Sequence, residues 1–243
     1  MTDFTPALFR DVLVRELQGH LTSEPTLAEF IAELQAIDCS TPREPGSTET
    51  PENVVRHLAQ AQAGLGGSDE LSAATAWLSN QIEWYQILQG DGIEPSLATG
   101  LTAGQLAGQI GLVPSDSARA GLFLLSPDLY YPLHQHGAKE FYLVVSGSLT
   151  LQHGREGTPF HVGPGEISVT PSNRVHALST GDAPCLIIYT WIGEVESPSW
   201  WWEQDAAGDW HRAGWKRQPN ARWVRTHEEP ITEAVLREAG ETL

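Results

Sequence analysis

The chain has 243 residues and a formal net charge of −17, because 31 acidic residues outnumber 14 basic ones. This length allows one decorated domain or two small ones, and the scarcity of cations disfavours nucleic acid as a partner, since phosphate binding requires clustered Lys and Arg. We find no apolar run near the ~20 residues of a membrane span, no secretory signal and no disulfide framework, so we expect a cytoplasmic protein without a membrane partner.

The first 90 or so residues are predicted to be mainly helical. Apolar residues recur at helical spacing from Thr5 to about Ile37, with a break that indicates two helices. A stretch rich in Pro, Gly, Thr and Glu (TPREPGSTETPE) then predicts a loop. Helical spacing resumes from Glu52 to about Ala63 and from Leu71 to about Leu88. We therefore expect residues 1–97 to form a helical N-terminal segment that packs on the next domain.

After Gly100 the pattern changes to short apolar or alternating runs separated by turn residues. These runs are GLFLLS, FYLVVSGSLTLQH, EISVT and CLIIYTWIG. Several strands at this spacing predict a mainly β domain, either an antiparallel barrel or a jelly roll, over residues 98–195.

Beyond Glu194 the regular pattern is lost. The sequence becomes rich in tryptophan (SPSWWWEQDAAGDWHRAGW), and a terminal helix is predicted from Thr232. We treat residues 196–243 as a C-terminal extension whose contacts the sequence does not define.

His134 and His136 are predicted to bind one metal ion. Residues two apart on a strand share a face, so both imidazoles can reach the ion while Gln135 points away. Glu140 adds an anionic oxygen nearby. This nitrogen and oxygen set suits Zn, Fe(II), Mn, Co or Ni better than Ca or Mg.

Two ordered motifs in this region resemble those of the cupins. The stretch HQHGAKEFYLVVSG resembles the first cupin motif, which Gly147 closes. The stretch GEISVTPSNRVHALST resembles the second, with Gly165, Pro171 and His176 at the expected spacing. The resemblance implies a cupin barrel, a double-stranded β-helix or jelly roll, with one divalent transition metal ion bound by His134, His136, Glu140 and His176.

Three positions depart from the cupin pattern. Asp128 replaces the glycine expected six residues before His134, Asn173 replaces a turn glycine, and Thr180 replaces the usual closing asparagine. The change at Asn173 is mild, because Asn tolerates the left-handed backbone that a turn glycine adopts. Some cupins have lost their metal, so a cupin without an ion is the alternative.

Among cupins, this chain resembles the bacterial cupin-type dimethylsulfoniopropionate (DMSP) lyases. The resemblance covers roughly Gly111 to Trp191, and its most specific features are Tyr131, three residues before the HxH pair, and the pair Glu140 and Tyr142. It implies a carbon–sulfur lyase that converts DMSP to dimethyl sulfide and acrylate by β-elimination, with the substrate carboxylate on the metal.

The resemblance also implies roles for three aromatic residues. Tyr142 is predicted to be the base that removes the α-proton, and Tyr131 to orient the substrate or assist the transfer. Tyr131 would face away from His134 on a regular strand, so its role requires a bend near Pro132. Trp191 is predicted to bind the sulfonium by cation–π attraction, with packing in the barrel core as the alternative.

Other functions remain open at this point. Another metallocupin enzyme, such as an Fe(II) dioxygenase or an isomerase, would use the same ligands. A regulatory cupin that binds a small molecule is disfavoured, because the N-terminal helices are acidic and lack a basic recognition helix. The aromatic run Trp200–Trp202 is also typical of an interface, so a homodimer stays open.

Overall fold

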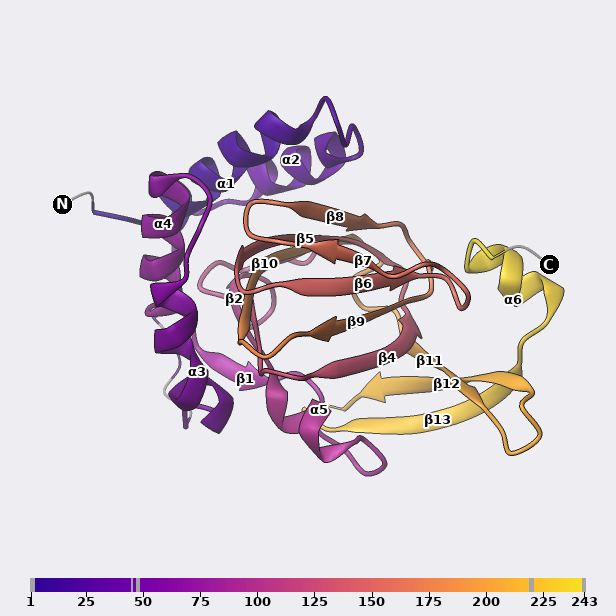
Figure 1. The fold of residues 1–243 in the computed structure, drawn as a ribbon. Coiled ribbons are helices and arrows are strands. Elements are labelled where there is room, and N and C mark those ends of the chain that lie inside the picture. The colour runs from indigo at the N-terminus through magenta and orange to yellow at the C-terminus, as the bar shows by residue number, and fades with distance from the viewer. Residues whose placement is uncertain (1–2, 45, 47–48, 219–220, 242–243) are drawn as a thin grey trace.

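The computed structural model describes residues 3–44, 46, 49–218 and 221–241. Positions 45, 47 and 48, which belong to the predicted loop, lie outside them. Figure 1 shows helices α1–α4 along one side of a β domain, with α6 on the far side. The helices are α1 (Pro6–His20), α2 (Leu27–Ala36), α3 (Glu52–Ala63), α4 (Asp69–Ser79), α5 (Pro95–Gly100) and α6 (Glu233–Glu238).

The helices begin where the sequence supplies caps. The hydroxyl of Thr5 accepts the backbone N–H of Leu8 at the start of α1, and that of Ser68 caps α4 in the same way. The helix predicted from Thr232 is confirmed, with Thr232 as its cap. In the described part of the chain, no helix combines the length and apolar character needed to cross a membrane.

One predicted helix is too long. The helical pattern extended to about Leu88, but α4 ends at Ser79, and Trp84–Gln86 form a strand that pairs with Leu101–Ala107. A short apolar run is compatible with either a strand or a helix, and here residues 84–86 form a strand because Leu101–Ala107 is available to pair with them. The division of the chain at residues 97 and 195 stays a prediction.

Two antiparallel sheets form the β domain and confirm the mainly β cupin fold. In spatial order, the six-stranded sheet contains β1 (Trp84–Gln86), β2 (Leu101–Ala107), β3 (Ala118–Leu125), β10 (Cys185–Gly193), β5 (Ala138–Ser146) and β8 (Ile167–Thr170). The seven-stranded sheet contains β13 (Trp223–Pro230), β12 (Trp210–Arg217), β11 (Ser199–Gln204), β4 (Tyr130–Gln135), β9 (His176–Thr180), β6 (Leu149–His153) and β7 (Phe160–Val162).

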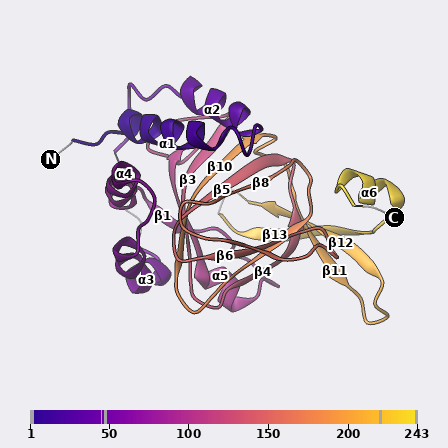
Figure 2. The same ribbon diagram turned by 45° about the horizontal axis from the view of Figure 1, so that its top comes forward.

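The six-stranded sheet is buried on both faces. On β5, Phe141 and Leu143 belong to the hydrophobic cluster shared with the helices, whereas Tyr142 and Val144 belong to the cluster inside the barrel. Alternate residues of a strand point to opposite faces. Burial of both faces explains why residues 141–145 of β5 form an unbroken apolar run. Figure 2 shows α1 and α2 lying across the six-stranded sheet.

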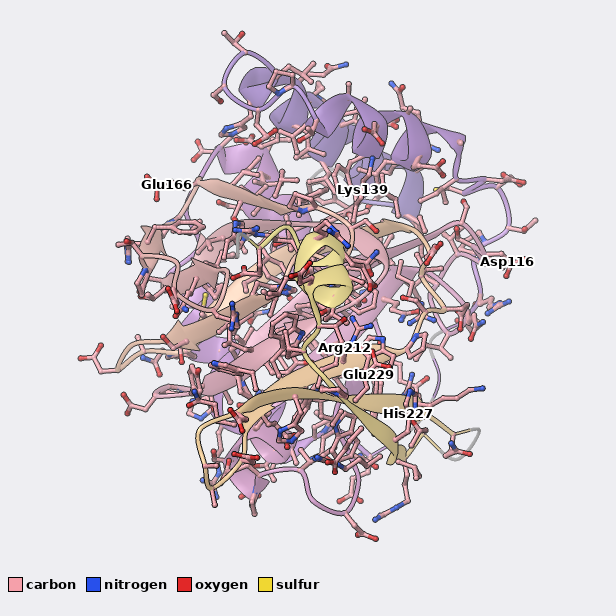
Figure 3. The ribbon with its side chains drawn as sticks, turned by 90° about the vertical axis from the view of Figure 1, so that its right-hand side faces the viewer. Asp116, Lys139, Glu166, Arg212, His227 and Glu229 are labelled. Atoms are coloured by element: carbon pink, nitrogen blue, oxygen red, sulfur yellow. The ribbon has the colours of Figure 1, made fainter. Side chains whose placement is uncertain are left out.

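The C-terminal extension adds three strands and a helix, although the sequence pattern predicted no strands there. β11 pairs with β4, and β12 and β13 extend the sheet outward. Arg212 on β12 donates hydrogen bonds to Glu229 on β13 (2.7 Å) and Glu238 in α6 (3.3 Å), which connects sheet and helix (Figure 3). The pairing that joins these strands to the barrel could not be predicted locally, because β4, the partner of β11, lies about 65 residues earlier in the chain.

The departures from the cupin motif fit the backbone. Asp128 and Asn173 both adopt positive φ angles, 54° and 59°, a conformation that Asp and Asn tolerate better than other non-glycine residues. The hydroxyl of Thr180 accepts the N–H of Leu129 (2.9 Å) and donates to the carbonyl of Ser126 (2.7 Å). These side chains therefore preserve the turns of the barrel.

The contact between α2 and the barrel leads to a stability prediction. Phe30 is fully buried and packs edge-on against Phe141, with ring centroids 5.2 Å apart. We expect Phe30→Ala to lower the free energy of unfolding by about 3–5 kcal/mol through lost burial and a residual cavity. Urea denaturation checks this value. Val55→Ala, at a site 72% exposed, should change it by less than about 0.5 kcal/mol, and similar losses for both variants would contradict the packing argument.

Candidate active site

A β-bulge in β4 brings Tyr131 and His134 onto the same face. Across the strand pair, Tyr131 lies opposite Leu178 and His134 opposite His176, so three residue steps on β4 match two on β9. The extra residue reverses the alternation of side chains. The bend that the role of Tyr131 required is therefore present, and its ring stacks on the His134 imidazole with centroids 3.7 Å apart and an angle of 8°.

Three buried imidazoles converge inside the barrel. His134 lies near the end of β4, and His136 directly follows that strand. His176 begins the adjacent strand β9. One ring nitrogen of each lies within 4.8 Å of the others. Gln135 points away, as predicted, and accepts the indole N–H of Trp202 at 2.5 Å.

The backbone determines which nitrogen of each ring faces inward. The Nδ1 atoms of His134, His136 and His176 lie 2.7, 3.0 and 2.9 Å from backbone carbonyl oxygens. A carbonyl oxygen only accepts hydrogen bonds, so each Nδ1 carries the proton and each Nε2 keeps a free lone pair. This arrangement is typical of histidines that bind a metal.

Glu140 lies beside two of the imidazoles. Its Oε2 is 3.5 Å from Nε2 of His136 and 3.6 Å from Nε2 of His176, and its Oε1 accepts the indole N–H of Trp191. Burial raises the pKa of Glu140, but a positive charge facing its Oε2, on protonated imidazoles or on a bound cation, lowers that pKa well below its usual range.

Several buried atoms in this cluster have no hydrogen-bond partner. They are Nε2 of His136, Nε2 of His176 and Oε2 of Glu140, and all three are acceptors that face one another. Buried polar groups without partners are costly. A shared cation would satisfy all three at once, and nitrogen and carboxylate donors suit a divalent transition metal ion. The residues present therefore fit such an ion.

A cavity lined by aliphatic and aromatic side chains lies beside His134. Its walls include Phe123, Tyr131, Tyr142, Trp191 and Trp223. Burial, followed by the neighbouring Glu140 carboxylate, raises the pKa of both Tyr142 and Tyr131. Without a cation nearby, both phenols would keep their protons.

The structure thus brings the seven predicted site residues into one region of the barrel. Sequence reasoning missed Phe123, Ser199 and Trp223, which also line the cavity. Phe123 belongs to the run GLFLLS, where the inward parity of β3 provided a signal. Ser199 and Trp223 belong to strands that the sequence pattern did not predict, so no signal identified them.

Comparisons with known proteins point to one family. The family model for dimethylsulfoniopropionate lyase matches residues 27–187. The dimethylsulfoniopropionate lyase DddQ of Ruegeria pomeroyi is 28% identical over 189 residues, which cover 72% of this chain and 93% of that protein.

Solved structures show the same relationship. The crystal structure of the DMSP lyase DddQ from Ruegeria pomeroyi matches with a TM-score of 0.61 and 26% identity, covering 82% of this chain and 96% of the other. A structure from a study of the DMSP lyases RdDddP and RnDddQII matches with a TM-score of 0.54 and 24% identity, covering 74% and 93%, and is similar in fold.

The environment of His153 predicts a pH dependence of stability. Burial, followed by the neighbouring His176, lowers the pKa of His153 to about 4. The unfolded chain therefore binds more protons than the folded one between the ordinary histidine pKa of about 6.5 and that value. The contribution of His153 to the free energy of unfolding is fully present above pH 6.5 and is lost as the pH falls from there toward about 4.

We expect the free energy of unfolding of the chelator-treated protein to fall between pH 7 and pH 4.5, and to fall less in His153→Gln. Urea titrations at several pH values measure both slopes. Equal slopes in the two proteins would show that His153 does not contribute.

Proposed function

This chain belongs to the dimethylsulfoniopropionate lyase family, and we propose that it cleaves DMSP to dimethyl sulfide and acrylate by a metal-dependent β-elimination. As a member of this family it is a carbon–sulfur lyase. The observation that carries the proposal is the cluster of three buried imidazoles and one carboxylate beside an apolar cavity whose walls include five aromatic rings, those of Phe123, Tyr131, Tyr142, Trp191 and Trp223.

His134, His136, Glu140 and His176 would hold the metal ion. The donor set accepts Zn, Fe(II), Mn, Co or Ni. When bound, such an ion supplies positive charge that stabilises the negative charge developing on the substrate carboxylate and favours the phenolate form of Tyr142. The protonated Nδ1 atoms keep the three rings oriented for this purpose.

Tyr142 is the proposed base. It follows Glu140 by two residues on β5, so the two side chains share the inner face, and its ring lines the cavity. The phenolate removes a proton from the carbon next to the carboxylate, and that C–H electron pair forms the carbon–carbon double bond. The carbon–sulfur bond breaks, its electron pair leaves with sulfur, and the products are acrylate and neutral dimethyl sulfide.

Tyr131 and the other rings position the substrate. The ring of Tyr131 is fixed against His134 by stacking and forms one wall of the cavity. A sulfonium group has no N–H to donate, so aromatic faces are the available recognition element, at roughly 0.5–2 kcal/mol per ring. Trp191 and Trp223 offer such faces.

Headspace gas chromatography tests the proposed reaction. Purified protein loaded with Zn, Fe(II) or Mn and given DMSP should release dimethyl sulfide, with equimolar acrylate in solution. His176→Ala should lose metal and product together, because it removes one of the buried imidazole ligands.

The same assay separates the alternatives. A lyase reaction is redox-neutral, so product should form without oxygen and with redox-inert Zn. An Fe(II) dioxygenase would require oxygen and consume it, and an isomerase would release no volatile product. The absence of dimethyl sulfide from metal-loaded protein with every ion tested would refute the proposal.

A single substitution tests the base. Tyr142→Phe removes the phenol oxygen but keeps the buried ring, so metal content should be unchanged. We expect the turnover number kcat to fall by at least about 100-fold, the usual contribution of a general base. Metal analysis and steady-state kinetics measure the two effects. A kcat near that of the wild type would rule out Tyr142 as the base.

A further inference from the structure

The two oxygens of Glu140 have different environments. Oε1 accepts a hydrogen bond from the indole N–H of Trp191. Oε2 has no hydrogen-bond partner and faces Nε2 of His136 at 3.5 Å and Nε2 of His176 at 3.6 Å. One oxygen is therefore engaged by the protein, and the other is directed toward the imidazoles.

Strand pairing places Trp191 in this position. Trp191 on β10 lies directly opposite Glu140 on β5, and residues directly opposite in an antiparallel pair have neighbouring side chains on the same face. The indole also stacks on the His136 imidazole, with ring centroids 4.2 Å apart and an angle of 27°. Trp191 thus contacts two of the four candidate metal ligands.

We propose that Trp191 is a positioning residue for the metal site. Its N–H holds Oε1 of Glu140, so that Glu140 offers the ion only Oε2, and its ring restrains the plane of His136. Trp191 therefore sets the number of carboxylate oxygens on the metal and the strength of metal binding. This role differs from binding the sulfonium group through the aromatic face of Trp191, because a phenyl ring at this position would also offer such a face.

The inference rests on the proposed function for the presence of the ion, but its test does not require DMSP. Trp191→Phe keeps an aromatic ring and removes the indole N–H. Metal affinity is measured by competition with a chromophoric chelator, and the coordination of Co(II) by its visible absorption spectrum. Partners that orient metal ligands typically contribute 10- to 100-fold in affinity, so we expect a weakening in that range and an altered Co(II) spectrum.

Trp202→Phe is the matched control. Trp202 is also buried, and its indole N–H donates to a side-chain oxygen, that of Gln135, which points away from the imidazoles. This variant loses a bond of the same kind and should bind Co(II) within about threefold of the wild type, with the wild-type spectrum. If Co(II) affinity fell equally in both variants, the cause would be general destabilisation of the protein, and the proposal would be overturned.

Nuclear magnetic resonance of the wild-type indole groups provides a second test that needs no stable variant. With Zn(II) bound, the indole N–H of Trp191 should stay shifted downfield and protected from exchange with solvent. If Zn(II) binding instead moved this resonance upfield and exposed the N–H to exchange, the hydrogen bond from Trp191 to Glu140 would be broken. Both oxygens of Glu140 would then be free to bind the ion, and the proposal would be overturned.

The two proposals fail separately. Weaker Co(II) binding by Trp191→Phe, in a protein that releases no dimethyl sulfide, would support the positioning role and refute the lyase reaction. Wild-type Co(II) affinity and spectrum in Trp191→Phe, with dimethyl sulfide still released by the wild type, would refute the positioning role alone.

Discussion

The site depends on a set of buried acceptors that face one another. Each of the three histidines donates its Nδ1 proton to the backbone, which leaves a lone pair on Nε2 inside the barrel, beside the Glu140 carboxylate. With all three imidazoles neutral, none of the inward atoms carries a proton, so these four groups cannot satisfy one another's acceptors. A bound cation would resolve this conflict, and in the proposed reaction it would also stabilise the negative charge that develops next to the substrate carboxylate.

The scaffold makes that arrangement rigid. The candidate ligands lie on strands β4, β5 and β9 or, for His136, directly after β4, and these strands pair with neighbours on both sides within two sheets. The six-stranded sheet is packed between helices and barrel interior, so its backbone has little freedom to adjust. The apolar walls of the cavity lower the local dielectric constant, which strengthens every electrostatic interaction between the site and a charged substrate.

The aromatic residues serve the site in different ways because of where their rings and polar atoms lie. Tyr131 stacks on a histidine, and Tyr142 extends from the same face as Glu140. Trp191 uses both parts of its side chain, since its N–H engages Glu140 while its ring covers His136. The C-terminal strands complete the cavity with Ser199 and Trp223, both of which lie beyond the last residue of the family match.

The sequence by itself determined the features that depend on local spacing: the helical and strand periodicities, the two histidines two residues apart, and the motif that contains His176. It also indicated the family, because Tyr131 and Tyr142 stand at specific distances from those histidines. Only the tertiary structure decided which strand pairs with which, and hence the bulge that turns Tyr131 toward His134, the three C-terminal strands, and the contact of Trp191 with a carboxylate 51 residues away. Such contacts arise from strand register between distant segments, and register is selected by burial of the whole sheet rather than by any short stretch of residues.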